Sequence, residues 1–258
     1  KLVLNLAPNY QIGVTSLSRM PIANRMPVVN SVLAALPRAE YQRLLADLQL
    51  VTLKFGEVLH EPDVPLRHIY FPIDCVVSLL LTVKGHADLQ IGLVGHEGVV
   101  GIPLALGIQV SSHRALVQGT GTAMRIESGL FCKRCSQSEP LRRTLYRYKH
   151  ALIGQIAQSV VCSHFHSVQE RLARYLLMTA DCARSGEIHL THEFVARTLG
   201  VRRVGVTYAA GDLQKRKLIA CSRGKITILD RNRLSAASCG CYKIIKRIND
   251  SAYTDTKH

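Results

Sequence analysis

Cysteines are the residues of this 258-residue chain whose spacing is easiest to test for chemistry. Cys132 and Cys135 form a CxxC pair, and Cys239 and Cys241 form a CxC pair; two such pairs together can supply the ligands of a zinc site. The pairs are about a hundred residues apart, in segments that we assign to different domains. We therefore expect free thiols and no metal site. Ordinary buried thiols also explain Cys132 and Cys162 better than a catalytic nucleophile does.

A second set of polar residues lies in the middle of the chain. The imidazole, carboxylate and guanidinium groups of this set suit a pocket that binds an anion or another small molecule. Polar residues at the rim of an empty β-structure explain the same pattern equally well. Haem would use His60, His68 or His96, but a hydrogen-bonded histidine is the commoner state. An iron–sulfur site is not favoured, because residues 1–74 contain no cysteine. The candidate effector residues are His96, Glu97, Gly101, His113 and Arg114.

The common enzyme motifs are missing from the sequence. There is no nucleotide-phosphate loop, no Gly-x-Ser-x-Gly and no paired histidine ligands on an expected helix. We therefore expect a protein that is not an enzyme, and we assign no cofactor.

The charge of the chain is concentrated in its second half. Residues 1–140 hold 12 Lys/Arg and 10 Asp/Glu, a net of +2, whereas residues 141–258 hold 21 and 8, a net of +13. Such a one-sided positive field attracts polyanions, and the release of counterions from phosphates is the main source of sequence-independent affinity for nucleic acids. Double-stranded DNA is the partner that we expect, although charge that serves only solubility would look similar.

No segment has the length of a membrane span. The longest apolar stretch, Cys75 to Val83, is far short of the roughly 20 residues needed to cross a bilayer. Residues 1–30 lack the apolar core of a secretory signal and are interpreted as a loosely ordered arm. We expect a cytoplasmic protein without a membrane partner.

Short β-rich runs separated by Gly and Pro fill residues 50–126. Strands with turn signals every ten residues or so predict an antiparallel roll or sandwich. A short helical entry segment precedes them, with a second helix expected near Pro37. The expected strands are Leu50–Phe55, Val58–His60, Arg67–Phe71, Cys75–Val83, Leu89–Val94, Arg114–Gln118 and Ala123–Ile126.

A long helix is predicted between Glu139 and Val161. Its apolar positions recur at spacings of three and four, close to the repeat of a two-helix seam. We interpret the stripe as the interface of a homodimer; packing of the helix on its own domain is the alternative. The stripe consists of Leu141, Leu145, Tyr148, Leu152 and Ile156.

The basic half contains the pattern of two short helices joined by a sharp turn. Ser167 to Glu170 is a capping box that starts an amphipathic helix, and Thr191 can cap a second, short helix. Gly200 can make the turn that follows, ahead of a helix from about Arg202 to Lys215. On this last helix the residues expected to point inward are Val206, Ala209, Ala210 and Leu213, and those expected to point outward are Val204, Tyr208, Gly211 and Lys215.

Two arginines, Arg202 and Arg203, stand at the start of that helix, where the macrodipole disfavours cations by roughly 0.3–1 kcal/mol. A local cost of this kind indicates a polyanionic partner. After the helix, Leu218–Cys221 and Lys225–Leu229 flank a glycine turn and predict a hairpin with Arg223 near its tip. A closing helix is expected in the tail that follows.

Together these segments resemble the cyclic AMP receptor protein / fumarate-nitrate reductase regulator (Crp/Fnr) family. The resemblance covers about residues 31–230 and is strongest at Phe55–Phe71 and Leu190–Ile219. It implies an α+β fold: an antiparallel, jelly-roll-like β-roll of the cyclic-nucleotide-binding type, a long dimerisation helix and a winged helix-turn-helix. The implied boundaries are 1–30 for the arm, 31–138 for the sensor roll, 139–166 for the dimerisation helix and 167–258 for the DNA-binding domain with its closing helix.

The resemblance also implies a function, namely a homodimeric transcription regulator on a near-palindromic site, with RNA polymerase as a further partner. Arg203 matches a guanine-reading arginine of the family, while Val204 and Tyr208 stand where many members have a base-reading Glu and a second Arg. The operator is therefore expected to differ from the usual one. The residues expected to contact DNA are Thr191, His192, Arg202, Arg203, Val204, Thr207, Tyr208, Lys215, Arg223 and Lys225.

The phosphate-binding cassette departs from the family pattern. Gly101 is followed by Ile102 and Pro103 where nucleotide-binding members have an acidic ribose ligand, and Arg114 is followed by Ala115 in place of Ser or Thr. We therefore expect an unidentified small-molecule signal other than cyclic AMP. The alternative function is a small-molecule or redox sensor whose output is a protein contact.

Overall fold

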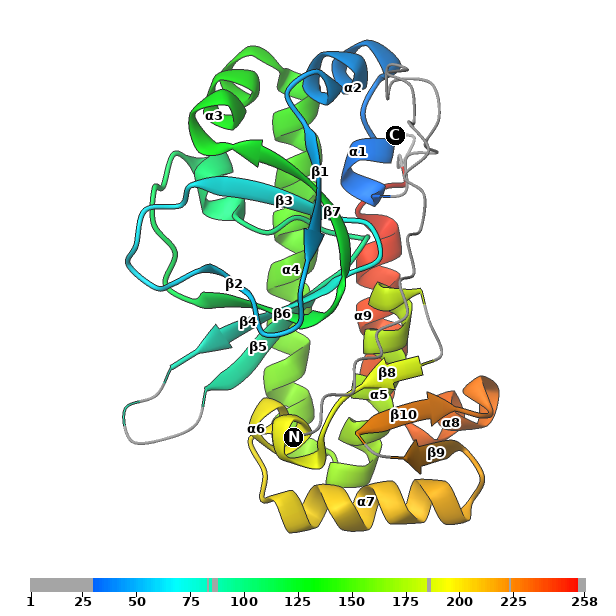
Figure 1. The fold of residues 1–258 in the computed structure, drawn as a ribbon. Helices are drawn as coiled ribbons and strands as arrows, with labels where there is room; N and C mark the ends of the chain where they lie inside the picture. Colours follow the sequence, from blue (N-terminus) through cyan, green and yellow to red (C-terminus); the bar gives the residue numbers. More distant parts are fainter. Residues whose placement is uncertain (1–29, 83, 85–87, 185–186, 223, 255–258) are drawn as a thin grey trace, which may run out of the picture.

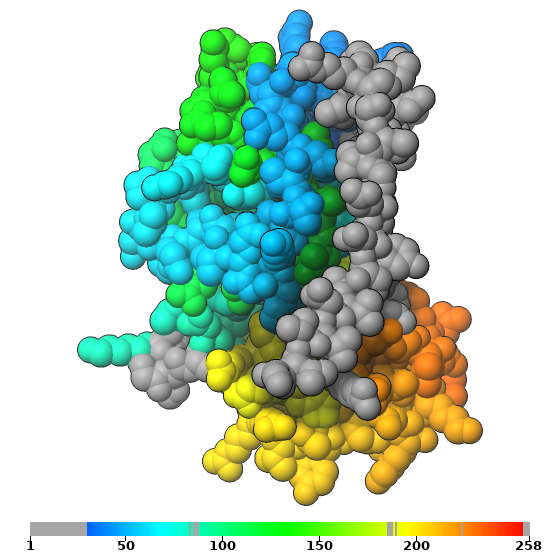
Figure 2. Space-filling model, in the orientation of Figure 1, coloured from blue at the N-terminus to red at the C-terminus, as the bar shows by residue number. Residues whose placement is uncertain are grey.

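A computed structural model describes residues 30–82, 84, 88–184, 187–222 and 224–254. One long helix joins a roll of β-strands to a lobe made mostly of helices, which together form the predicted α+β architecture (Figure 1). In the space-filling view the roll lies above the carboxyl-terminal lobe (Figure 2). Among the described residues, no helix is both long enough and apolar enough to cross a membrane.

Two short helices, α1 (Ser31–Ala34) and α2 (Arg38–Leu45), lead into the roll, with Pro37 at the N-cap of α2. Asn30 fixes this entry. Its side-chain oxygen accepts hydrogen bonds from the first amides of α1, and its buried amide nitrogen donates to the carbonyl oxygens of Pro72 and Gly98. One side chain therefore caps the helix and fastens it to two loops of the roll.

The roll consists of two antiparallel sheets. One has the order β1-β7-β3, formed by β1 (Gln49–Leu53), β7 (Gly121–Glu127) and β3 (His68–Pro72). The other has the order β2-β6-β4-β5, formed by β2 (Val58–His60), β6 (Arg114–Gly119), β4 (Val76–Leu81) and β5 (Leu89–Val94). A short 3₁₀ helix, η2 (Ile102–Leu106), lies between β5 and β6. All seven predicted strands are present, with ends shifted by at most two residues.

Helix α3 (Ser128–Gln137) follows the roll, and α4 (Glu139–Phe165) runs behind the roll toward the carboxyl-terminal lobe (Figure 1). The predicted apolar stripe of α4 does not face solvent. Leu141, Leu145, Tyr148 and Leu152 are buried in the core of the roll, and Ile156 packs against the same core. The assignment of these five residues to a dimer interface is wrong, because their side chains already fill the chain's own core.

The carboxyl-terminal lobe begins with α5 (Val168–Ala183), whose capping box at Ser167 and Glu170 forms as predicted. A three-stranded sheet of order β8-β10-β9 contains β8 (Glu187–His189), β9 (Ile219–Ser222) and β10 (Lys225–Ile228). The hairpin of β9 and β10 was predicted; β8 was not. Helices α6 (His192–Leu199), α7 (Arg203–Lys215) and α8 (Arg231–Ala237) complete this lobe around a separate apolar core.

The closing helix α9 (Cys241–Ser251) leaves this lobe and packs along α4. The two helices approach closely at Gly154, where an added β-carbon would lie 3.2 Å from the side chain of Ile248. The neighbour that this glycine admits is therefore a helix of the same chain. The carboxyl-terminal segment thus returns to the long helix.

The burial of the α4 stripe can be tested through stability. We expect Leu145→Ala to lower the free energy of unfolding by about 2–5 kcal/mol, because the side chain is fully buried and its removal leaves a cavity. Urea denaturation at one fixed protein concentration measures the loss. The matched control is Leu130→Ala, the same deletion at a leucine that is 43% exposed, for which about 0.5 kcal/mol is expected. Equal losses in both variants would contradict the assignment.

Candidate nucleic-acid interface

Helix α7 is presented as an exposed helix at the end of the molecule farthest from the roll (Figure 1). It begins at Arg203, one residue later than predicted, and Arg202 is its N-cap residue. Its inner face packs on the core of the lobe, and all four residues predicted to point inward are buried: Val206, Ala209, Ala210 and Leu213. Burial of one face fixes which side chains the other face displays.

The outer face of α7 combines cations with large apolar side chains. Val204 is 55% exposed and Tyr208, one turn later, is 76% exposed. Arg202, Arg203 and Thr207 are exposed beside them. Arg202 makes no side-chain cap, and within the described parts of the chain neither arginine forms an ion pair with a carboxylate. Two uncompensated cations and open backbone amides therefore occupy one helix end, an arrangement that attracts anions.

Residues of α6 and of the hairpin lie against this helix start. Thr191 is the N-cap of α6, where its hydroxyl accepts a hydrogen bond from the amide of Phe194 at 3.1 Å. His192 Nδ1 lies 3.2 Å from Thr207 Oγ1, and Thr207 in turn donates to the carbonyl oxygen of Arg203 at 3.1 Å. The contact between His192 and Thr207 thus joins the start of α6 to the second turn of α7.

A groove of about 300 Å³ runs between α6, α7 and the hairpin. It is lined by four of the ten residues predicted to contact DNA, namely Thr191, His192, Arg203 and Lys225. Lys215 lies apart from them on the exposed last turn of α7. Arg223, at the predicted tip of the hairpin, lies outside the described residues.

The turn before α7 is rigidly held. Gly200 ends α6 with a φ of +63°, in the left-handed region that favours glycine. Arg171 of α5 donates a hydrogen bond to the carbonyl oxygen of Leu199, and Gln169 donates to the carboxylate of Asp212 at 2.7 Å. Helix α5 therefore fixes both the turn and the rear of α7.

The predicted effector residues do not gather in one pocket. Arg114 is held between two carboxylates, with Nε 2.7 Å from Glu61 and Nη1 2.8 Å from Asp88. These carboxylates raise the pKa of Arg114 and compensate its charge. His113 packs its ring against His60, and burial followed by the proximity of His113 lowers the pKa of His60 to about 4. Among the described residues, this corner of the roll therefore offers a phosphate no uncompensated guanidinium.

The other three effector candidates lie in different surroundings. His96 and Glu97 line a cavity of about 250 Å³ between the roll, α5 and α9, with Cys182 and Tyr242 among its other walls. Neither His113 nor Arg114 lines it. Gly101 adopts a φ of +98°, and a β-carbon there would lie 2.6 Å from the side chain of Ile69. The backbone of this turn requires a glycine, so the presence of Gly101 is explained without a role in ligand binding.

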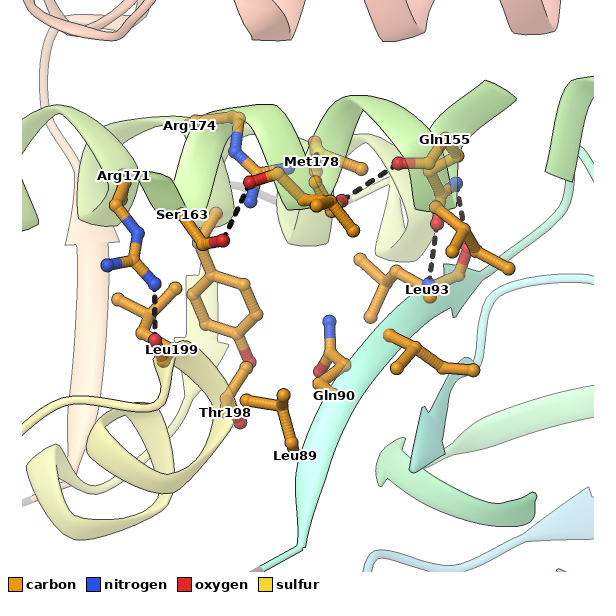
Figure 3. Close-up of a pocket in the computed structure, with 16 residues that line it drawn as sticks. Leu89, Gln90, Leu93, Gln155, Ser163, Arg171, Arg174, Met178, Thr198 and Leu199 are labelled. Carbon is orange, nitrogen blue, oxygen red and sulfur yellow. Dashed lines mark hydrogen bonds between the residues drawn. The ribbon is translucent and has the colours of Figure 1, made fainter. Parts of the chain in front are cut away.

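Sequence reasoning missed a pocket of about 120 Å³ where β5, α4, α5 and α6 meet (Figure 3). On one wall, the side chain of Gln155 bonds the backbone of Leu93 twice, at 2.7 and 3.1 Å. On another lie Arg171 and Arg174, whose Nε atoms are buried without a hydrogen-bond partner. No signal in the sequence pointed to these arginines, because charged residues on an amphipathic helix are ordinarily exposed.

Comparisons with known proteins agree with this geometry. Residues 170–237 match the family described as the Crp-like helix-turn-helix domain. The global nitrogen regulator of Synechococcus elongatus is 22% identical over 199 residues, which span 73% of this chain and 89% of that protein.

Solved structures share the fold. FixK2 from Bradyrhizobium japonicum has a TM-score of 0.63 at 14% identity, covering 75% of this chain and 98% of its own. A protein from Eubacterium rectale, described as a transcriptional regulator of the crp/fnr family, has a TM-score of 0.62 at 17% identity, covering 80% of this chain and 96% of its own.

The role of the exposed helix start can be measured by DNA binding. On a duplex selected by the protein from a random pool, we expect Arg203→Ala to cost about 1–3 kcal/mol of binding free energy, with little change on unselected DNA. Fluorescence anisotropy gives both values. Arg43→Ala is the matched control, since it removes the same charge from an exposed site on α2. Equal losses on both DNAs would mean that Arg203 contacts only phosphate.

Proposed function

We propose that this chain, a DNA-binding transcription regulator of the Crp/Fnr family, binds a near-palindromic site as a homodimer under the control of a signal other than cyclic AMP. The observation that carries the proposal is the exposed start of α7, with its two uncompensated arginines beside Val204 and Tyr208. RNA polymerase is the protein partner that such a role requires, and the cytoplasm is where the DNA would be met.

In this proposal α7 enters the major groove. The amino-terminal residues of a recognition helix reach base edges, and arginine to guanine is the commonest specific contact. Val204 supplies methyl groups that suit the methyl of thymine, and Tyr208 offers an apolar ring with a hydroxyl. Val204 and Tyr208 stand in place of the charged residues common in the family. The helix therefore makes fewer charged contacts to bases, and it prefers a different DNA sequence.

Phosphate contacts set the position of the protein on the duplex. Thr191 and His192 at the start of α6, Lys225 in the hairpin and Lys215 at the end of α7 surround the proposed reading residues. Arg223 is proposed for the same role from its place in the sequence. Contacts of this kind carry no sequence information but fix register, and they make binding fall steeply with salt.

The homodimer is proposed to use the face of α4 that the roll leaves uncovered. The exposed residues of this face follow one another at spacings of three and four along most of the helix, which is the heptad repeat of a two-stranded coiled coil. They are Arg143, Tyr146, His150, Ile153, Ala157, Val160 and His164.

A second copy of the chain is the occupant that this repeat indicates. Tyr146, Ile153 and Val160 lie at intervals of seven residues and are 48%, 54% and 65% exposed, an unusual cost for a helix that faces only water. Two α4 helices paired along this face would relate the two copies of α7 by a two-fold axis. Such a dimer matches a near-palindrome whose half-sites are about 34 Å apart.

We expect Ile153→Glu to convert the dimer into a monomer, because two carboxylates would face each other in an apolar seam. Sedimentation equilibrium measures the mass of each variant, and circular dichroism checks that the helices are retained. The matched control is Ile108→Glu, the same change at an isoleucine that is 50% exposed beyond η2, and it should remain dimeric. A monomeric parent protein would rule out the proposed seam.

The signal is proposed not to be cyclic AMP because Arg114 is engaged by Glu61 and Asp88, and Gly101 is followed by apolar residues. A cyclic phosphate would have to displace both carboxylates and would find no acidic ligand for its ribose.

Calorimetric titration with cyclic AMP should accordingly release no binding heat, and the affinity for the selected duplex should be the same with and without the nucleotide. The double variant Glu61→Gln, Asp88→Asn frees Arg114 and serves as a comparison. It should also fail to bind, since the ribose ligand is still missing. Saturable binding to the parent protein would contradict this part of the proposal.

A further inference from the structure

Three cysteines and one histidine meet at the junction between the long helix and the DNA-binding lobe. Cys162 lies in the last turn of α4, and His166 is the C-cap residue of that helix, one residue before the capping box of α5. Cys239 lies between α8 and α9, and Cys241 is the first residue of α9. We call these four residues the Cys3His cluster. Segments more than 70 residues apart in the sequence are brought together in it.

The spacing of the four ligand atoms suits a single tetrahedral ion. The Sγ atoms of Cys162 and Cys239 are 3.4 Å apart, and Sγ of Cys241 is 3.6 Å from Nδ1 of His166. All four ligand atoms lie within 4.8 Å of one another. Zinc–sulfur bonds of about 2.3 Å at tetrahedral angles place two sulfurs about 3.8 Å apart, so only small movements are needed.

The surroundings of the cluster are those of an enclosed structural site. All three cysteines are buried, and only the half-buried His166 leads toward the surface. Gln158 of α4 places its amide nitrogen 3.1 Å from Sγ of Cys241, where an N–H donor stabilises a metal-bound thiolate. The cluster thus has its own compact core, apart from those of the roll and the lobe.

Without a bound ion, the buried positive charge of Arg174 beside the cluster is hard to explain. Arg174 is only 8% exposed, its Nε has no hydrogen-bond partner, and no carboxylate among the described residues pairs with it. Its guanidinium lies close enough to Cys162 for the two side chains to interact electrostatically. A divalent ion with three thiolates and a neutral imidazole carries a net charge of −1. That charge would compensate the buried guanidinium.

Two other uses of the cluster fit less well. A disulfide between Cys162 and Cys239 would bring their sulfurs from 3.4 to about 2.05 Å and would leave Cys241 and His166 without a role. An iron–sulfur cluster spreads its four protein ligands over two or more iron atoms, which requires ligands on different irons to stand further apart than these. Three buried thiols around an imidazole are, in contrast, a common set of zinc ligands.

We propose that the Cys3His cluster binds one zinc ion. From the sequence, Cys132 and Cys135 are the candidate partners of Cys239 and Cys241 in a zinc site. Cys135 lies instead in the core of the roll, and the thiol that meets Cys239 and Cys241 is Cys162. An ion at this place would fasten the start of α9 to the end of α4. It would also fix the direction in which α5, and with it α7, leaves the long helix.

The test uses the full-length protein purified under reducing conditions. We expect one zinc ion per chain by elemental analysis. After removal of zinc, addition of Co²⁺ should give one equivalent of the intense visible bands of tetrahedral cobalt and the charge-transfer bands of cobalt–thiolate bonds. Hydrogen exchange should become faster in α9 and at the start of α5 when the metal is removed, while the core of the roll stays unchanged.

Variants separate this site from other thiols. Cys241→Ser should lose the cobalt bands and the bound zinc, whereas Cys132→Ser, the matched change at a half-buried thiol of α3, should keep both. If Cys241→Ser does not fold, His166→Gln removes the least buried ligand and should weaken cobalt binding at least tenfold with the fold retained. The proposal is wrong if the parent protein binds no Co²⁺, if Cys241→Ser keeps the bands, or if protein isolated with thiol-blocking reagents contains a Cys162–Cys239 disulfide.

Discussion

Helix α4 packs against the roll on one face and against α9 on another, and the arrangement of the molecule follows from this constraint. One face closes the core of the roll with Leu145 and Tyr148, while α9 approaches a second face at Gly154. The remaining face keeps Ile153 and Val160 in solvent. This helix of 27 residues thus has two faces covered by its own chain and a third that still presents apolar side chains to solvent. The proposed second copy resolves this, and it also provides two α7 helices for one duplex.

The helix-turn-helix was predictable because its information is local. Inward and outward residues of α7 alternate with the helical period, and Gly200 and Thr191 mark boundaries that backbone geometry demands. The roll was predictable for a similar reason, since turn residues punctuate its strands. The strand β8 was missed because three residues are too few to show a period.

Contacts between distant segments were not predictable in the same way. The stripe of α4 was assigned to a partner because an apolar face looks the same whether its neighbour is the same chain or another. Arg114 looked like an anion ligand because its counter-charges, Glu61 and Asp88, stand 53 and 26 residues away. Cys162 and Cys239 are separated by 77 residues, and the CxC motif by itself did not indicate its partners. In each case the missing information is which surfaces meet, which one sequence alone does not state.

The turn before α7 also touches the roll directly. A β-carbon at Gly200 would lie 3.0 Å from Cδ1 of Leu89, at the start of strand β5. Strand β5 and the helix-turn-helix are therefore in direct contact, and a shift of β5 can reach the turn before α7 without passing along the long helix. The size of the side chain at position 89 therefore sets how closely the start of β5 and this turn can approach each other.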